Sequence, residues 1–249
     1  MSIKLETVGL KDKIDNIKNR IDGYRQKLPL FMGKLNVHTL VAVAGIIGPL
    51  ALTVGDVTAG LTSSNYSLVK NSISSLALTN AGWLQTIGFL ALGLLVEIFT
   101  TGLMFSVKRK KWFHAGIALL VFFGFAMLLI GAFHTDPVGT ARTQEGRIHG
   151  LSATFAFSIF PFSVLCMLPS FKRDDNWKDL YRYTQATFYA AIFFLVVTRI
   201  FQEGTSFFGL SERLLVANMI IWVEVSAVRL FVLSLKRGGN NMFNFTALP

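Results

Sequence analysis

The chain has 249 residues, of which 52% are hydrophobic and only 15% are charged. Soluble domains carry charge on about 25% of their residues, and here the charges fall in short segments between long apolar runs, which excludes an ordinary soluble protein. The formal net charge of +10 does not indicate a nucleic-acid partner, because 18 of the 24 Lys and Arg residues lie in alternate connections between those runs.

Residues 1–34 form a charged segment in which apolar residues recur at helical spacing. Ile14, Ile17, Ile21, Tyr24 and Leu28 fall on one face of a helix, with Lys and Arg elsewhere. This pattern predicts a cytoplasmic amphipathic helix on the membrane surface, attracted by anionic lipid. The alternative is that the same segment binds a protein partner.

Six apolar runs follow, and each is long enough to cross about 30 Å of hydrocarbon. They cover residues 36–55, 83–107, 112–133, 148–168, 183–203 and 213–235. The predicted fold class is therefore all-α, a polytopic membrane bundle of six transmembrane helices preceded by the amphipathic helix. The predicted domains are the segment 1–34, the transmembrane domain 35–237 and a short cytoplasmic tail, 238–249.

The distribution of basic residues predicts how the bundle is oriented. Basic clusters such as 108–111 occupy alternate connections, so they mark the cytoplasmic side. The connections 56–82, 134–147 and 204–212 are then external, and their only basic residues are Lys70, Arg142 and Arg147. We expect a multi-pass protein of the cell membrane with both termini in the cytoplasm.

The connection 56–82 is long and rich in Ser, Thr and Asn, and a long loop of this kind is more often functional than a short turn. Leu68, Val69, Ile73 and Leu76 share a helical face, which predicts a short interfacial or re-entrant helix here.

Polar and ionisable residues gather at the predicted outer ends of the helices. Such groups are costly near a membrane, so they tend to face a cavity or one another. The candidate site comprises Asp56, Ser72, His134, Asp136, Arg147, His149, Arg199 and Glu203.

The short connection between the third and fourth runs brings His134, Asp136 and His149 to the same membrane face. They either pair structurally, with Asp136 capping the fourth helix or pairing with Arg142 or Arg147, or they transfer protons or contact a ligand. A divalent metal held by His134, Asp136 and His149 is a further alternative. No cofactor is otherwise predicted.

Two other sets of charges leave alternatives open. Arg199 and Glu203 are four residues apart, so they form an ion pair on one helix face, or Arg199 binds a phosphate or carboxylate group from the outer cavity. Deeper in the bundle, Arg229 could neutralise Glu97 or Glu224, and the alternative is that a buried Glu without a partner relays protons.

Three segments together carry a family resemblance. Residues 66–76 read Tyr-Ser-Leu-Val-Lys-Asn-Ser-Ile-Ser-Ser-Leu before Trp83 and Gly88, residues 131–137 read Gly-Ala-Phe-His-Thr-Asp-Pro, and residues 148–150 read Ile-His-Gly. In this order, over roughly residues 36–235, the chain resembles the prokaryotic membrane family named domain of unknown function 998. The family's Ile-Ser-Glu/Asp-Leu-Gly stretch lacks its acidic residue here, and His134 stands where Pro is frequent, whereas Asp136 and His149 fit.

The resemblance implies a six-helix topology and a polar outer face, but no established activity. Three functions fit the sequence, and whether the protein is an enzyme stays open. The first is the binding of a lipid headgroup or small ligand in an outer polar pocket. The second is lipid hydrolysis within the membrane, with metal or proton transfer at the histidines and Ser72 as an assisting hydroxyl. The third is an accessory subunit whose residues 1–34 dock a partner.

Overall fold

The computed structural model describes residues 16, 18, 36–201 and 206–236. These residues form six long α-helices and two short 3₁₀ helices. The long helices are α2 (Val37–Thr62), α3 (Gly82–Ser106), α4 (Phe113–Ala132), α5 (Gln144–Arg173), α6 (Tyr181–Ile200) and α7 (Phe208–Lys236), and the 3₁₀ helices are η1 (Ser74–Leu78) and η2 (Lys178–Leu180). The predicted amphipathic helix and the tail 238–249 lie outside the described residues.

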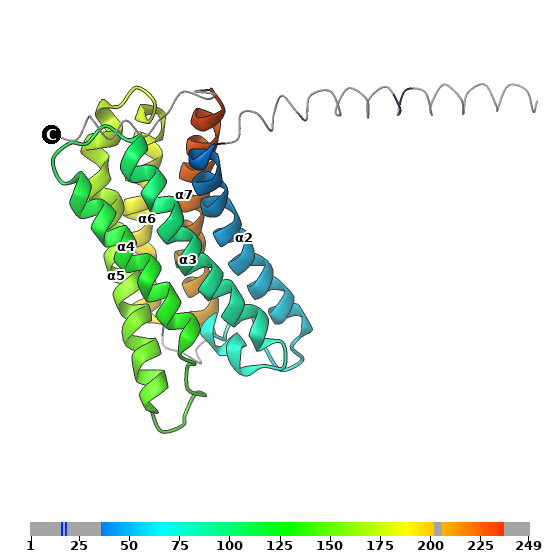
Figure 1. The fold of residues 1–249 in the computed structure, drawn as a ribbon. Helices are drawn as coiled ribbons and strands as arrows, with labels where there is room; N and C mark the ends of the chain where they lie inside the picture. Colours follow the sequence, from blue (N-terminus) through cyan, green and yellow to red (C-terminus); the bar gives the residue numbers. More distant parts are fainter. Residues whose placement is uncertain (1–15, 17, 19–35, 202–205, 237–249) are drawn as a thin grey trace, which may run out of the picture.

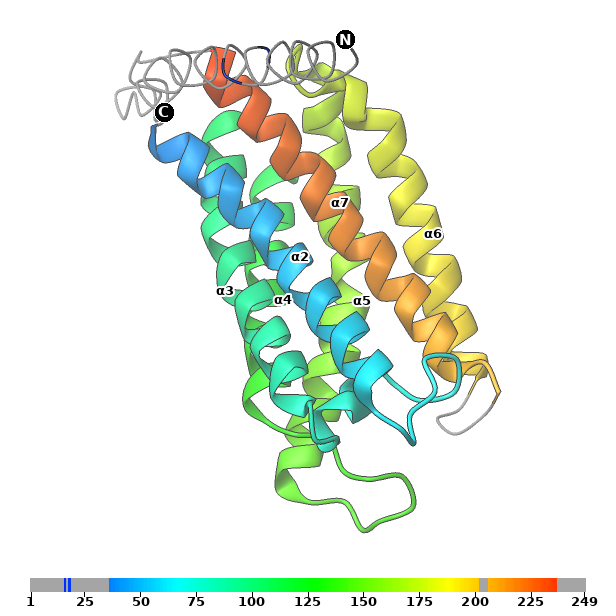
Figure 2. The same ribbon diagram turned by 90° about the vertical axis from the view of Figure 1, so that its right-hand side faces the viewer.

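All six long helices are apolar and long enough to cross a membrane, which confirms a multi-pass membrane bundle. In Figures 1 and 2 they lie side by side along a shared direction. Each helix packs against the next in chain order, and α7 returns to pack against α2, so the six helices form a closed ring. Helix α7 also contacts α3 and α5, which places much of it inside the bundle.

The two ends of the bundle differ in chemistry. One end, here called the basic end, carries the connections 107–112 and 174–180, with the cluster Lys108–Lys111. The other, called the Ser-rich end, carries the connection 63–81, the hairpin 133–143 and the first turn of α7, at the bottom of Figure 1. All candidate site residues that the structure describes lie at or near the Ser-rich end.

Aromatic side chains fill the interior toward the basic end. Trp222 is fully buried, packs against Phe160 and Phe171, and donates its indole N–H to Thr184 Oγ1 at 3.1 Å. Trp177 is also buried and stacks on Phe171. Trp222 is therefore a packing residue, since a buried indole with a satisfied N–H is the arrangement that stabilises a core.

Helix boundaries agree with the predicted runs except where polar residues extend a helix. Helix α2 continues to Thr62, whose hydroxyl donates to the Thr58 carbonyl at 2.8 Å. Helix α5 begins at Gln144 because Thr143 caps it, accepting from the Gly146 N–H at 3.1 Å. The helix predicted over Leu68–Leu76 is wrong, since that stretch forms turns and only the 3₁₀ helix η1.

Candidate functional site

The Ser-rich end brings part of the predicted site together around one cavity of about 450 Å³, which we call the His149 cavity. The connection 63–81, the hairpin, α5, α6 and α7 all contribute to it. Its polar lining comprises Ser72, Ser74, Thr135, Arg142, His149, Thr154, Thr198, Arg199 and Glu212. Three predicted residues, Ser72, His149 and Arg199, therefore line one cavity although they lie far apart in the sequence.

His149 is buried on α5 and is held by the end of α4. Its Nδ1 lies 2.8 Å from the Phe133 carbonyl oxygen and 3.1 Å from that of Ile130. Because carbonyl oxygens only accept, Nδ1 must carry a proton and donate it. In the neutral ring the lone pair is then on Nε2, so this nitrogen is an acceptor or a base.

Ser72 is buried at the start of η1, where its Oγ accepts from the Ser75 N–H at 3.1 Å. The next residue, Ile73, donates its N–H to Glu212 Oε2 at 2.7 Å. Glu212 lies near the start of α7 and is itself buried. The sequence analysis missed Glu212, because its role depends on α7 meeting the 63–81 connection.

The two arginines of the His149 cavity are exposed residues on different elements. Arg142 precedes α5, and Arg199 lies in the last turn of α6. Among the lining residues that the structure describes, Glu212 is the single carboxylate, and one of its oxygens already accepts a backbone N–H. The lining thus offers more positive than negative charge, which favours an anionic group.

A second cavity of about 560 Å³, the hairpin cavity, is lined by Asp136 and Arg147 and shares Thr135, Arg142, Gly150 and Thr154 with the first. Asp136 accepts from Thr143, through the N–H at 2.9 Å and the hydroxyl at 2.7 Å. Asp136 therefore braces the residue that caps α5. This contact agrees with the structural alternative for Asp136.

His134 is separate from both cavities as a half-exposed side chain. Its Nδ1 lies 3.8 Å from Glu145 Oε2, a contact at the limit of an ion pair. Across the parts of the chain that the structure describes, no group of three His, Cys, Asp or Glu side chains is placed to share a metal ion. The metal alternative at His134, Asp136 and His149 thus remains a prediction without a supporting geometry.

Asp56 lies outside both cavities and pairs with Arg213, another residue that the sequence analysis missed. Arg213 Nε and Nη2 lie 3.1 and 3.0 Å from the two carboxylate oxygens. The Arg213 Nη1 donates to the carbonyls of Leu68 and Asn71 at 2.7 and 2.9 Å, and Nη2 also contacts the Tyr66 hydroxyl. The predicted outer carboxylate is therefore a structural anchor for the 63–81 connection.

Two expectations about ion pairs have different outcomes. Glu203 lies outside the described residues, so its pairing with Arg199 stays a prediction. Arg229 donates to the Asn176 carbonyl at 2.6 Å and to Asp179 at 3.1 Å, so the expectation that it neutralises Glu97 or Glu224 is wrong. The reason is that Arg229 reaches the connection at the basic end rather than a side chain in the bundle.

The comparison with protein families matches most of the bundle. A family model described as "Protein of unknown function (DUF998)" matches residues 46–229, more than half of the chain. No curated protein and no solved structure matches the chain.

Proposed function

This chain belongs to the DUF998 family of proteins of unknown function, and from that premise we propose that it binds the anionic headgroup of a membrane lipid in the His149 cavity. The observation that carries the proposal is that Arg142, Arg199, His149 and Ser72 line a single cavity at the Ser-rich end of a membrane bundle. A volume of about 450 Å³ lies within the roughly 300–1,000 Å³ of small-molecule sites.

The positive charge of the His149 cavity determines that an anionic headgroup binds there. Two guanidinium groups at the cavity provide planar, permanently charged donors that bind a phosphate or carboxylate at two points. The hydroxyl group of Thr135 adds a neutral donor beside them. A phosphate or carboxylate headgroup would therefore meet charge-assisted hydrogen bonds, whereas a cationic headgroup would meet repulsion.

Apolar residues on α5 and α6 supply a path for an acyl chain. Ala153, Phe157 and Leu195 line the same cavity, and all three pack against the hydrophobic core. Helix α6 is the least buried of the six spans, and its exposed side chains, among them Phe193 and Val196, are large and apolar. A lipid could therefore place its headgroup among the arginines and its chain along α6.

The test is an analysis of lipids that copurify with the full chain. We expect enrichment of an anionic lipid, and Arg199→Gln or Arg142→Gln should weaken its binding about tenfold, the cost of one charge-assisted hydrogen bond. The matched control is Arg147→Gln, because Arg147 is an exposed arginine at the start of α5, close in sequence to Arg142, but does not line the His149 cavity. Lipid content that is the same in all three variants and the parent chain would contradict the proposal.

The hydrolase alternative uses the same cavity, because Ser72 and His149 both line it. Incubation with a labelled phospholipid distinguishes the two functions. Binding alone returns the lipid intact, whereas Ser72-dependent release of a product would establish hydrolysis. The accessory role assigned to residues 1–34 is tested separately, since deleting residues 1–30 should abolish association with a partner and leave the bundle folded.

We further propose that the Ser-rich end faces away from the cytoplasm of a plasma-membrane protein. The support is the concentration of basic residues at the opposite end. With the single cysteine removed by Cys166→Ser, Thr140→Cys should react with a membrane-impermeant maleimide on intact cells, whereas Lys111→Cys should react only after lysis. The reverse pattern would place the lipid site on the cytoplasmic side.

A further inference from the structure

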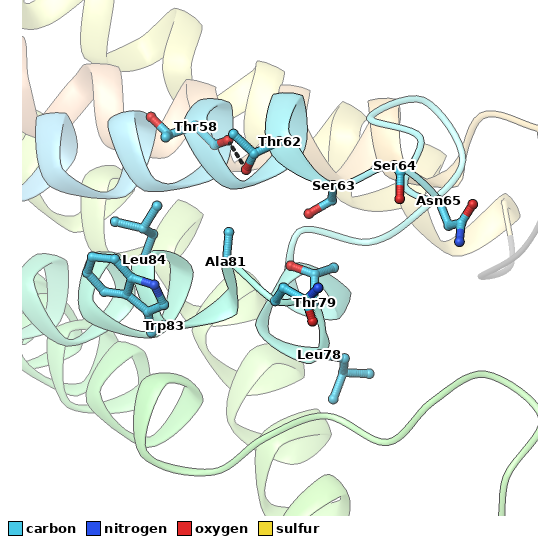
Figure 3. A pocket seen from close by; sticks show the side chains of 11 residues that line it. Thr58, Thr62, Ser63, Ser64, Asn65, Leu78, Thr79, Ala81, Trp83 and Leu84 are labelled. Atoms are coloured by element: carbon cyan, nitrogen blue, oxygen red, sulfur yellow. Dashed lines mark hydrogen bonds between the residues drawn. The ribbon is translucent and has the colours of Figure 1, made fainter.

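A third cavity lies at the Ser-rich end, on the other side of the 63–81 connection, and we call it the Trp83 cavity. It has a volume of about 610 Å³, is open to the surface, and is lined by the last turns of α2, the residues after it and the start of α3. Figure 3 shows Thr58, Thr62 and Ser63 on one side of it, facing Thr79, Ala81 and Trp83 on the other. It shares no lining residue with the His149 cavity.

The lining is polar but carries no charge. Seven of its eleven residues have hydroxyl or amide side chains, and none is Asp, Glu, Lys or Arg. The nearby carboxylate of Asp56 is held by Arg213. The lining therefore offers a charged ligand no side chain of opposite charge, so the cavity suits a neutral ligand.

The hydrogen bonds within the wall indicate what such a ligand must offer. The hydroxyls of Thr62, Ser63 and Thr79 donate their protons to backbone carbonyls at 2.8, 2.7 and 2.8 Å. A hydroxyl has one proton and two lone pairs, so these three groups can only accept a further bond. The amides of Asn65 and Asn80, both exposed, add donors and acceptors. A complementary ligand therefore carries several hydroxyl groups.

Trp83 adds an apolar surface beside these acceptors. Its side chain is 61% exposed although it lines the cavity, and it stands in the first turn of α3, at the depth where indole rings anchor helices to the headgroup region. An exposed indole face combined with hydroxyl acceptors suits a sugar ring, which has apolar C–H faces and a rim of hydroxyls.

We propose that the Trp83 cavity binds an uncharged sugar, either as the headgroup of a glycolipid or as a free saccharide. The proposal does not rest on the anionic-lipid function, because the two cavities have no lining residue in common. The position of Trp83 at the membrane interface makes the glycolipid the source to be tested first.

The first test measures binding by fluorescence in phosphatidylcholine nanodiscs, using the full chain with Trp112→Phe. Trp177 and Trp222 are fully buried, so Trp83 is then the single exposed indole in the described part of the chain. One arm titrates methyl β-glucoside, and the other compares nanodiscs with and without monoglucosyl diacylglycerol. We expect a saturable change in emission, and the arm that responds identifies the source of the sugar.

Substitutions in the wall assign the response to this cavity. Thr62→Val and Asn80→Leu should each weaken binding about fivefold, the value of one hydrogen bond. The matched control is Thr140→Val, because Thr140 is also an exposed threonine whose hydroxyl donates to a backbone carbonyl, that of Pro137 at 2.8 Å, but it lies on the hairpin outside this cavity. Arg199→Gln should likewise leave sugar binding unchanged.

The second test addresses Trp83 itself by native mass spectrometry of retained glucosyl lipid. Trp83→Ala should retain roughly three- to tenfold less lipid, as expected for loss of an aromatic contact. Trp112→Ala is the control, since Trp112 is 60% exposed at the other end of the bundle. The proposal is overturned if neither sugar arm saturates, if phosphatidic acid displaces the sugar, or if both tryptophan variants retain as much lipid as the parent.

Discussion

Arg213 on α7 and Asp56 on α2, 157 residues apart, form a two-point ion pair with nitrogen–oxygen distances of 3.1 and 3.0 Å. Each side chain is only 15% exposed. The same guanidinium contacts Tyr66, whose hydroxyl donates to the Ser72 carbonyl at 2.6 Å. The ion pair therefore fixes the connection that presents Ser72 to the His149 cavity, so bundle stability and the shape of the proposed lipid site depend on one network.

Arg213→Met should destabilise the bundle by about 3–5 kcal/mol, because it leaves Asp56 as a shielded charge without its partner. It also removes the donors to the Leu68 and Asn71 carbonyls. Thermal unfolding in detergent measures the effect, and Asp56→Asn should act in the same direction.

The control for this prediction is Arg229→Met at the basic end. Arg229 also pairs with an aspartate at 3.1 Å, but Asp179 is 65% exposed. An exposed pair contributes only about 0–1 kcal/mol. Equal losses of stability in Arg213→Met and Arg229→Met would show that the Asp56 pair has no special structural role.

Gly209→Ala should release the 63–81 connection from α7. A Cβ at this position would lie 2.1 Å from the Asn71 carbonyl oxygen, a backbone atom that cannot rotate away. The Leu210 N–H, which donates to the Val69 carbonyl at 3.0 Å, would be displaced with it. We expect faster trypsin cleavage after the exposed Lys70, and a loss of roughly 1–3 kcal/mol in stability. Gly150→Ala is the control, because nothing lies within 4 Å of a Cβ there, and its cleavage rate should match the parent's.

Tyr66 should make stability fall at high pH. Burial raises the pKa of its phenol from 10.0 to about 12, although Arg213 acts in the opposite direction. The folded state therefore holds this proton more tightly than the unfolded chain does. The stabilisation from this group is intact below pH 10 and is lost as the pH rises toward about 12.

Unfolding measured across this pH range checks the Tyr66 prediction. Tyr66→Phe should remove the part of the decline that belongs to this phenol, whereas Tyr189→Phe, which alters a side chain 61% exposed, should keep the parent's decline. A Tyr66→Phe curve parallel to that of the parent chain would contradict the assignment.

The sequence was sufficient for the features that depend on composition along one helix. All six predicted spans correspond to observed helices, because twenty apolar residues in a row specify a membrane helix without reference to the rest of the chain. The structural role of Asp136 was also accessible from the sequence, since this residue acts on the hairpin that contains it. Such features are local.

The remaining features depend on which helices meet, and no local pattern contains that information. Arg213 and Glu212 lie at the start of a predicted helix, where no sequence pattern marks them as site residues. In the structure α7 packs against α2, so that Arg213 reaches Asp56 and Glu212 reaches the Ile73 N–H. Ser72, His149 and Arg199 were all candidates, but their convergence on one cavity follows from the closed ring of helices. Asp56 was a candidate site residue because it is ionisable and lies at a predicted helix end. Its role is structural instead, since Arg213, 157 positions away in the sequence, neutralises its charge.

Gln85→Met should raise the stability of the bundle. The Gln85 side chain on α3 is fully buried, and neither its amide nitrogen nor its oxygen has a hydrogen-bond partner among the described residues. An unmade buried hydrogen bond costs about 1–3 kcal/mol, and methionine has a similar shape without that cost. The measurement is the melting temperature in detergent. Thr184→Val should lower the melting temperature, because it removes the hydrogen-bond acceptor of the buried Trp222 indole N–H. If both variants lower the melting temperature, the Gln85 amide has a hydrogen-bond partner such as a bound water or a ligand.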